Sequence, residues 1–254
     1  MQISFFFLLL LSGFSFADSS IEKHEVGNWA GGFMVGRLEK LEQSGRVWQT
    51  WEGKLSIGNY GDDQYAGFSF PVAAASDEIA QQLQSISKDE TYVFEFTRKH
   101  IFTPKIQDAH YVIIGVHKLY PGVLDEDPLE IEVKQGPRGK WNEGALQGHI
   151  TGVERWGKIN VVCTIYFSVG GLGKKKNAWA EGRARFNVYN ENACQFAEKV
   201  LISGRESEVS FSEYFLPDYI DATKRIAHKI RILSDFESSM LESTSTSAND
   251  STQR

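Results

Sequence analysis

Two stretches of this chain, Phe33-Met-Val-Gly-Arg-Leu38 and Gly45-Arg-Val-Trp-Gln-Thr-Trp-Glu-Gly-Lys-Leu-Ser-Ile-Gly58, recur later in the same order. The second copy reads Leu146-Gln-Gly-His-Ile150 and then Gly157-Lys-Ile-Asn-Val-Val-Cys-Thr-Ile-Tyr-Phe-Ser-Val-Gly170. Glycine falls on glycine at a constant offset of 112 residues, the difference between 148 and 36. The repeat predicts two copies of one folding unit.

Each copy alternates apolar and polar residues in short runs that are bounded by glycine, which is typical of β-strands. One helix interrupts each series, at Ser76–Ser87 and at Asn190–Ser203, and both helices open on a residue that favours the N-cap. The predicted order is three strands, a helix and two strands, which is the arrangement of the small five-stranded OB barrel. We therefore predict a mainly β fold of two tandem OB-like barrels with one helix each.

The repeat also divides the chain into segments. We predict a signal peptide at 1–17, a lead-in at 18–32, the first barrel at 33–120, a connection at 121–143 and the second barrel at 144–233. The connection contains three prolines, and a short strand within it is predicted at Leu129–Val133. The last segment, 234–254, is rich in Ser, Thr, Asp and Asn and is predicted to be disordered.

The N-terminus predicts export. Ile3 to Phe16 is an uncharged apolar run, and Ser15-Phe16-Ala17 places small residues at −3 and −1 before a cleavage at Asp18. An uncleaved anchor and a buried strand stay open as alternatives, although the run is short for a span of about 20 residues. After cleavage we expect no membrane span and a periplasmic or secreted protein.

Composition limits the partners. Apolar and charged residues make up 41% and 24% of the chain, as in a soluble globular protein. The net charge of −6 disfavours nucleic acid as a partner, because that binding depends on clustered Lys and Arg. Nothing in the sequence indicates an oligomeric state.

The two cysteines, Cys163 and Cys194, lie on a strand and at the start of the helix of the second copy. An exported protein can oxidise such a pair to a disulfide. Two buried thiols are the alternative, since the first copy has Trp51 and Ala80 at the matching positions and its fold needs no bridge.

One dense motif carries a resemblance. At Val35-Gly-Arg-Leu38, Val47-Trp-Gln-Thr-Trp-Glu-Gly-Lys-Leu55 and Val93-Phe-Glu-Phe-Thr-Arg98 the chain resembles a group of uncharacterised bacterial envelope proteins. The resemblance implies an envelope location and a small β domain, and it covers chiefly 33–119. Some of those proteins carry a name that implies 6-phosphogluconate dehydrogenase, but no G-x-G-x-x-G here follows a strand and opens a helix.

Catalytic and metal-binding motifs are missing from the sequence. The loop Gly170-Gly-Leu-Gly-Lys-Lys-Lys176 fails the phosphate-binding P-loop pattern at both ends, so we interpret it as a solvated hairpin loop with a weak anion contact as the alternative. None of the six histidines has a metal-ligand spacing, and no G-x-S-x-G holds a serine as nucleophile. We predict no cofactor, no metal and no catalytic residue.

Aromatic residues offer the best candidate surface. They lie on the second strand and the loops of each copy, where OB barrels bind oligosaccharides, nucleic acids or peptides. Burial in the barrel core is the competing interpretation. The candidate ligand- or partner-binding residues are Trp48, Trp51, Tyr60, Tyr65, Trp156, Lys174 and Trp179.

Three functions are compatible with these observations. The first is an exported, non-enzymatic binding or interaction protein of the bacterial envelope, with a protein or glycan partner. The second is a hydrolytic or ligand-processing enzyme with a site between the barrels, for which His100 or His149 would have to meet a carboxylate. The third is a structural envelope component, which exposed unpaired strand edges would favour.

Overall fold

The computed structural model describes residues 28–44, 50–57, 68–99, 111–124, 128–133, 140–156, 162–169, 183–214 and 224–233. These residues form eleven β-strands and two α-helices, so the prediction of a mainly β chain is confirmed. The predicted signal peptide and the predicted disordered tail lie outside the described residues. Neither helix among the described residues has the length and hydropathy to cross a membrane.

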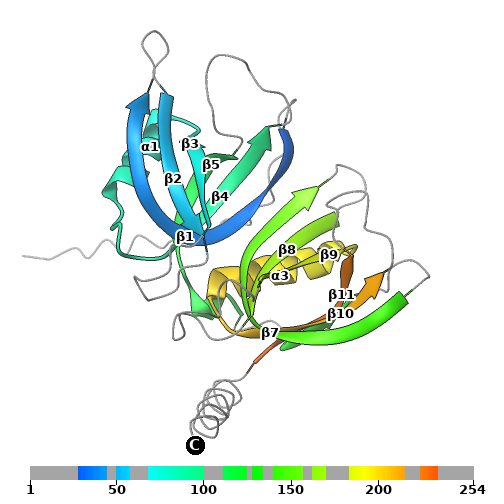
Figure 1. Cartoon of the computed structure of the whole chain (residues 1–254). Coiled ribbons are helices and arrows are strands. Elements are labelled where there is room, and N and C mark those ends of the chain that lie inside the picture. The colour runs from blue at the N-terminus through cyan, green and yellow to red at the C-terminus, as the bar shows by residue number, and fades with distance from the viewer. Residues whose placement is uncertain are drawn as a thin grey trace, which may run out of the picture.

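The first half of the molecule comprises five strands and one helix (Figure 1). They are β1 (Asn28–Ser44), β2 (Thr50–Ile57), β3 (Phe68–Ala74), α1 (Asp77–Ser85), β4 (Tyr92–Lys99) and β5 (Tyr111–Lys118). The strands pair in the order β1-β2-β3-β5-β4, and β4 pairs back with β1. Only the β3–β5 pair is parallel among them.

The second half repeats this order. It comprises β7 (Lys140–Trp156), β8 (Val162–Val169), β9 (Arg183–Val188), α3 (Glu191–Ser203), β10 (Ser207–Tyr214) and β11 (Arg225–Ile232). Its strands pair in the order β7-β8-β9-β11-β10, and β10 pairs back with β7. β7 and β8 begin and end 112 residues after β1 and β2, so the repeat of the sequence is a repeat of structure.

The repeat extends to an irregularity of the first strand pair. The β1–β2 register shifts between Leu38 and Lys40, and the β7–β8 register shifts between Ile150 and Gly152. The two shifts are again 112 residues apart. Such bulges bend a strand sharply. In each half the first strand changes neighbours at a glycine just before the bulge, from β4 to β2 at Gly36 and from β10 to β8 at Gly148.

The prediction of tandem barrels supposed that each half forms its own sheet, but the two halves share one sheet. β1 pairs with β7 from Ala30↔Trp156 to Met34↔Gly152, which joins all eleven strands into one sheet. Gly32 makes this approach possible, because a Cβ there would lie 1.9 Å from the carbonyl oxygen of Val153. The start of β1 at Asn28 also gives strand structure to the end of the predicted lead-in.

The two apolar cores meet at the same place. Successive side chains of a strand point to opposite faces. Accordingly Met34 packs in the core of the first half, whereas its neighbours Phe33 and Val35 pack in the core of the second half. Val93 of β4 joins them there. These three side chains on the outer face of the first half are therefore part of the core of the second half.

The predicted connection contributes secondary structure to the second half. Its described parts contain the 3₁₀ helix η1 (Pro121–Leu124), the strand β6 (Glu130–Glu132), which pairs with β11, and the first residues of β7. The short strand predicted at Leu129–Val133 is thereby confirmed within one residue at each end. Leu124 and Val133 are buried in the second core.

Candidate functional site

A row of polar residues crosses β7, β8 and β9 on one face of the second half. Glu154 faces Thr164, and Thr164 faces Asn187, so the three side chains lie side by side. The Thr164 hydroxyl donates a hydrogen bond of 3.0 Å to Oδ1 of Asn187. All three are buried, with exposed fractions of 1%, 0% and 0%. Buried polar groups at such positions need partners, and the first half supplies one.

That partner is Arg98, near the end of β4. Its Nη1 donates a hydrogen bond of 3.0 Å to Oε1 of Glu154, and the Tyr166 hydroxyl donates one of 2.8 Å to Oε2. The guanidinium carbon lies 5.2 Å from the centre of the Trp156 ring and 5.4 Å from the centre of the Tyr111 ring. Burial opposes the charge of Arg98, but the Glu154 carboxylate outweighs it and the pKa of Arg98 is raised.

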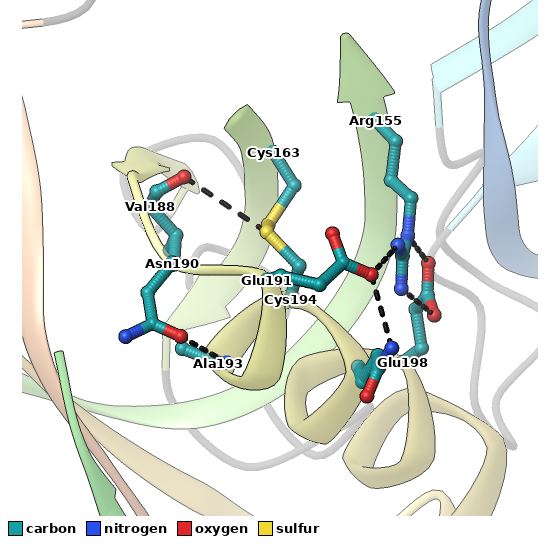
Figure 2. A network of polar contacts seen from close by, with 9 residues as sticks. Arg155, Cys163, Val188, Asn190, Glu191, Ala193, Cys194 and Glu198 are labelled. Carbon is teal, nitrogen blue, oxygen red and sulfur yellow. Dashed lines mark hydrogen bonds and ion pairs between the residues drawn. A yellow bond between two sulfur atoms is a disulfide. The ribbon is translucent and has the colours of Figure 1, made fainter. Parts of the chain in front are cut away.

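A second ion-pair group attaches α3 to β7 (Figure 2). Arg155 donates two hydrogen bonds to Glu198, of 2.5 Å from Nε to Oε1 and 2.7 Å from Nη2 to Oε2, and a third from Nη1 to Glu191. Burial raises the pKa of Glu198 even though Arg155 favours its charged form. Burial also opposes the charge of Arg155, but its bonds to Glu198 raise the pKa of the guanidinium.

A disulfide holds the same helix. Cys163 of β8 and Cys194 of α3 are bonded, with their Cα atoms 5.9 Å apart, within the usual range for a disulfide. Both residues are fully buried. Of the two interpretations left open by the sequence, the structure has the bridge. Figure 2 shows that it lies one helical turn from the Arg155 contacts, so α3 is fixed to two adjacent strands.

The matching face of the first half is different. The residues 112 positions before Glu154 and Thr164 are Glu42 and Glu52, which also face each other, and Lys40 faces Lys54 beside them. Lys40 and Glu42 form an ion pair of 2.6 Å at side-chain exposures of 57% and 61%. This face is an exposed surface of alternating charge.

Two of the seven predicted aromatic and basic site residues are described, and the structure does not bring them together. Trp51 packs against the first core and donates a hydrogen bond of 2.9 Å from its indole nitrogen to Asp77, at the start of α1. Trp156 is buried beneath Arg98 at the junction of the halves. The other five, Trp48, Tyr60, Tyr65, Lys174 and Trp179, lie outside the described residues.

The residues that sequence reasoning missed are the charged ones at the junction: Arg98, Glu154, Arg155, Glu191 and Glu198. One signal was available, because Glu154-Arg155-Trp156 interrupts the apolar alternation of a predicted strand. Of the histidines proposed for an enzyme site, His100 is outside the described residues. His149 faces Ser168, and burial lowers its pKa to about 4.

Neither a protein-family model nor a curated protein matches the chain. Among solved structures it is similar to the wild-type single-stranded DNA binding protein from Thermus aquaticus, at 13% identity over 82% of this chain and 93% of that chain, with a TM-score of 0.25. It is also similar to a chain of a Replication Protein A heterotrimer bound to ssDNA, at 8% identity over 90% of this chain and 54% of that chain, with a TM-score of 0.25. Similarity this low carries no argument about function.

One expectation about partners needs correction. The net charge of −6 does not disfavour nucleic acid as a partner, and the similar structures are of single-stranded DNA-binding proteins. The expectation was wrong in its reasoning, because net charge sums over the whole chain and strand binding depends on the local charge of one groove.

Proposed function

We propose that this chain is an exported, non-enzymatic binding protein made of two OB-type barrels fused into one rigid body. The closed pairing order of each half supports the barrel assignment, because it is that of the five-stranded OB barrel. The disulfide supports export, because such bonds persist in oxidising compartments. The resemblance of Val47–Leu55 to envelope proteins agrees with that location.

One observation indicates which half carries the ligand-binding surface. OB barrels take their ligands on the face of the second and third strands. In the second half the polar row on this face is buried, and Arg98 of the first half is bonded to it. On the matching face of the first half Glu42 is exposed, as is the neighbouring pair Lys40 and Lys54, whereas Glu52 is half-buried and Ala73 is buried. The first half is therefore the ligand-binding half, and the second half is the support that orients it.

The described junction favours this function over an enzyme between the barrels. A general acid or base needs a carboxylate that is available to a substrate. Both oxygens of Glu154 are occupied by Arg98 and Tyr166, and both oxygens of Glu198 by Arg155. These groups hold structure together. In the same way, the pairs β4–β1 and β10–β7 close the strand edges that a structural polymer would use.

Photo-crosslinking tests the proposal. A photoreactive residue is placed at Lys54, which is exposed on the first half, or at Arg185, which is exposed on the second half, and each protein is irradiated in its native envelope fraction. We expect adducts at position 54 and few at position 185. Sensitivity of the adduct to nuclease, protease or glycosidase then identifies the ligand class.

Equal yields at the two positions would contradict the assignment of the binding half. The absence of adducts at both positions, in protein that is folded and exported, would contradict the binding function itself. Mass spectrometry of the exported chain tests the predicted signal peptide separately. A mature protein that still begins at Met1 would contradict cleavage of that peptide.

A further inference from the structure

The surroundings of Arg98 have the composition of a receptor for a planar cation. Glu154 is 1% exposed, and its carboxylate is oriented by the Tyr166 hydroxyl at 2.8 Å, so one oxygen is directed to the guanidinium. The rings of Trp156 and Tyr111 lie 5.2 and 5.4 Å from the guanidinium carbon, within the range of cation–π attraction. We call Tyr111, Glu154, Trp156 and Tyr166 the guanidinium cage.

The elements that form the cage come from both halves. Glu154 and Trp156 are on β7, Tyr166 is on β8, and Tyr111 is the first residue of β5. The β1–β7 pairing ends at Trp156, so the backbone that carries two of the four residues is anchored independently of Arg98. The side chain of Arg98 keeps 32% of its surface exposed, which leaves an edge of the cage accessible from solvent.

Two other arginines of the second half have different surroundings. Arg155 binds two carboxylates and is only 12% exposed, which leaves little access. Arg185 lies 5.4 Å from the Tyr166 ring but belongs to an exposed side chain. At Arg98 a buried carboxylate and two aromatic rings thus meet an accessible edge.

We propose that the cage is a guanidinium-binding site, which the chain fills with its own Arg98 and which accepts a guanidinium group from another molecule when Arg98 is withdrawn. The recognition is the same for a small guanidinium compound and for an arginine side chain of a partner: a charge-assisted hydrogen bond to Glu154 and stacking between two rings. The proposal does not depend on which half binds the main ligand.

Chemical rescue tests it, with methylguanidinium as the probe. Arg98→Ala removes the cation that is bonded to the buried Glu154 carboxylate, so we expect a lower Tm for this variant. Millimolar methylguanidinium, far below the molar range in which guanidinium denatures proteins, should raise that Tm saturably and bind in calorimetry. Wild type should show neither effect, because its cage is occupied. Methylammonium at the same concentration should rescue less, since it cannot stack as a plane.

Two further variants keep the test decisive. Arg98→Ala/Glu154→Gln should fold, because the buried charge is gone, and should bind methylguanidinium at least about tenfold more weakly. Arg225→Ala, whose guanidinium lies 5.3 Å from the Phe211 ring and so outside the cage, is the matched control, and its Tm should not respond to the probe. The proposal is overturned if folded Arg98→Ala responds equally to methylguanidinium and methylammonium, or if the Glu154→Gln double variant binds the probe as well as Arg98→Ala does.

Discussion

The two halves of this molecule share a strand plan but attach their helices by different means. In the first half, α1 is nine residues long and is linked to β2 by one hydrogen bond between Trp51 and Asp77. In the second half, α3 has thirteen residues and is linked by a disulfide and by the Arg155 ion pairs. Cys163 occupies the position that matches Trp51, so the same strand position contacts the helix in both halves, by a covalent bond in the second and by a hydrogen bond in the first.

The difference follows from what each helix must support. α1 covers only the core of its own half, into which Ala80 and Leu83 are buried. α3 packs in the core that also receives Phe33, Val35 and Val93 from the first half. A helix on which both halves rest has more contacts to lose if it moves. The second half is therefore expected to be the more stable region, and the junction to unfold together with it.

The largest expected effect is at the strand junction, where Gly32 and its repeat equivalent Gly144 form a matched pair. A Cβ at Gly32 meets the Val153 backbone oxygen at 1.9 Å, whereas one at Gly144 meets the ring edge of Phe211 at 2.9 Å. Backbone cannot move aside as a ring can. We expect Gly32→Ala to cost more than about 4 kcal/mol of unfolding free energy and Gly144→Ala about 1–2 kcal/mol, measured by urea unfolding. Equal losses would mean that β1 and β7 are not fixed at this distance in solution.

The next effect separates buried from exposed ion pairs. Arg155→Ala removes the cation that binds Glu191 and Glu198, and Glu198 is only 8% exposed. The variant should therefore lose about 3–5 kcal/mol of unfolding free energy. The exposed pair of the first half is the comparison, and Lys40→Ala should cost less than about 1 kcal/mol. Thermal unfolding of both variants checks the contrast. A small loss for Arg155→Ala would show that α3 does not depend on β7.

The disulfide provides the third test. The bridge closes a loop of 31 residues, so removing it in Cys163→Ala/Cys194→Ala should cost about 2–4 kcal/mol. In the first half, Trp51→Phe keeps an aromatic ring and removes only the hydrogen bond to Asp77, for an expected loss of about 0.5–1.5 kcal/mol. Denaturant unfolding of the exported, oxidised protein measures both. Thiol labelling of the unfolded, unreduced wild type should modify neither cysteine.

Much of the fold could be predicted from the sequence because its signals are local. The N-caps Ser76 and Asn190 accept hydrogen bonds from the third helical residue in each helix, as their residue types predict. The apolar stripe of the second helix, which includes Phe196 and Val200, is buried. These features depend on residues within a few positions of each other, where periodicity and capping are informative.

The junction could not be predicted, because it depends on contacts between distant segments. Phe33, Met34 and Val35 are consecutive apolar residues, which is typical of a strand buried on both faces, but most of the core around Phe33 and Val35 comes from the second half, more than a hundred residues away. The contacts of the two described candidate residues could not be predicted for the same reason. Aromatic residue type suggested a ligand surface at Trp51 and Trp156, whereas the structure uses both rings to hold its own parts together.

The smallest and most gradual effect concerns pH, and it arises at His149, which has an arginine, Arg37, at the matching position of the first half. Burial lowers the pKa of His149 from 6.5 to about 4. Between pH 4 and pH 6.5 the imidazole is therefore protonated in the unfolded chain and neutral in the folded chain. The contribution is fully present above pH 6.5 and is lost as pH falls toward 4, which amounts to at most about 3 kcal/mol. Unfolding free energies of wild type and His149→Gln should therefore diverge across this window, with the variant losing less. Parallel curves would show that His149 has the same pKa in the folded and the unfolded chain. The imidazole would then be accessible to water between β7 and β8, and not buried.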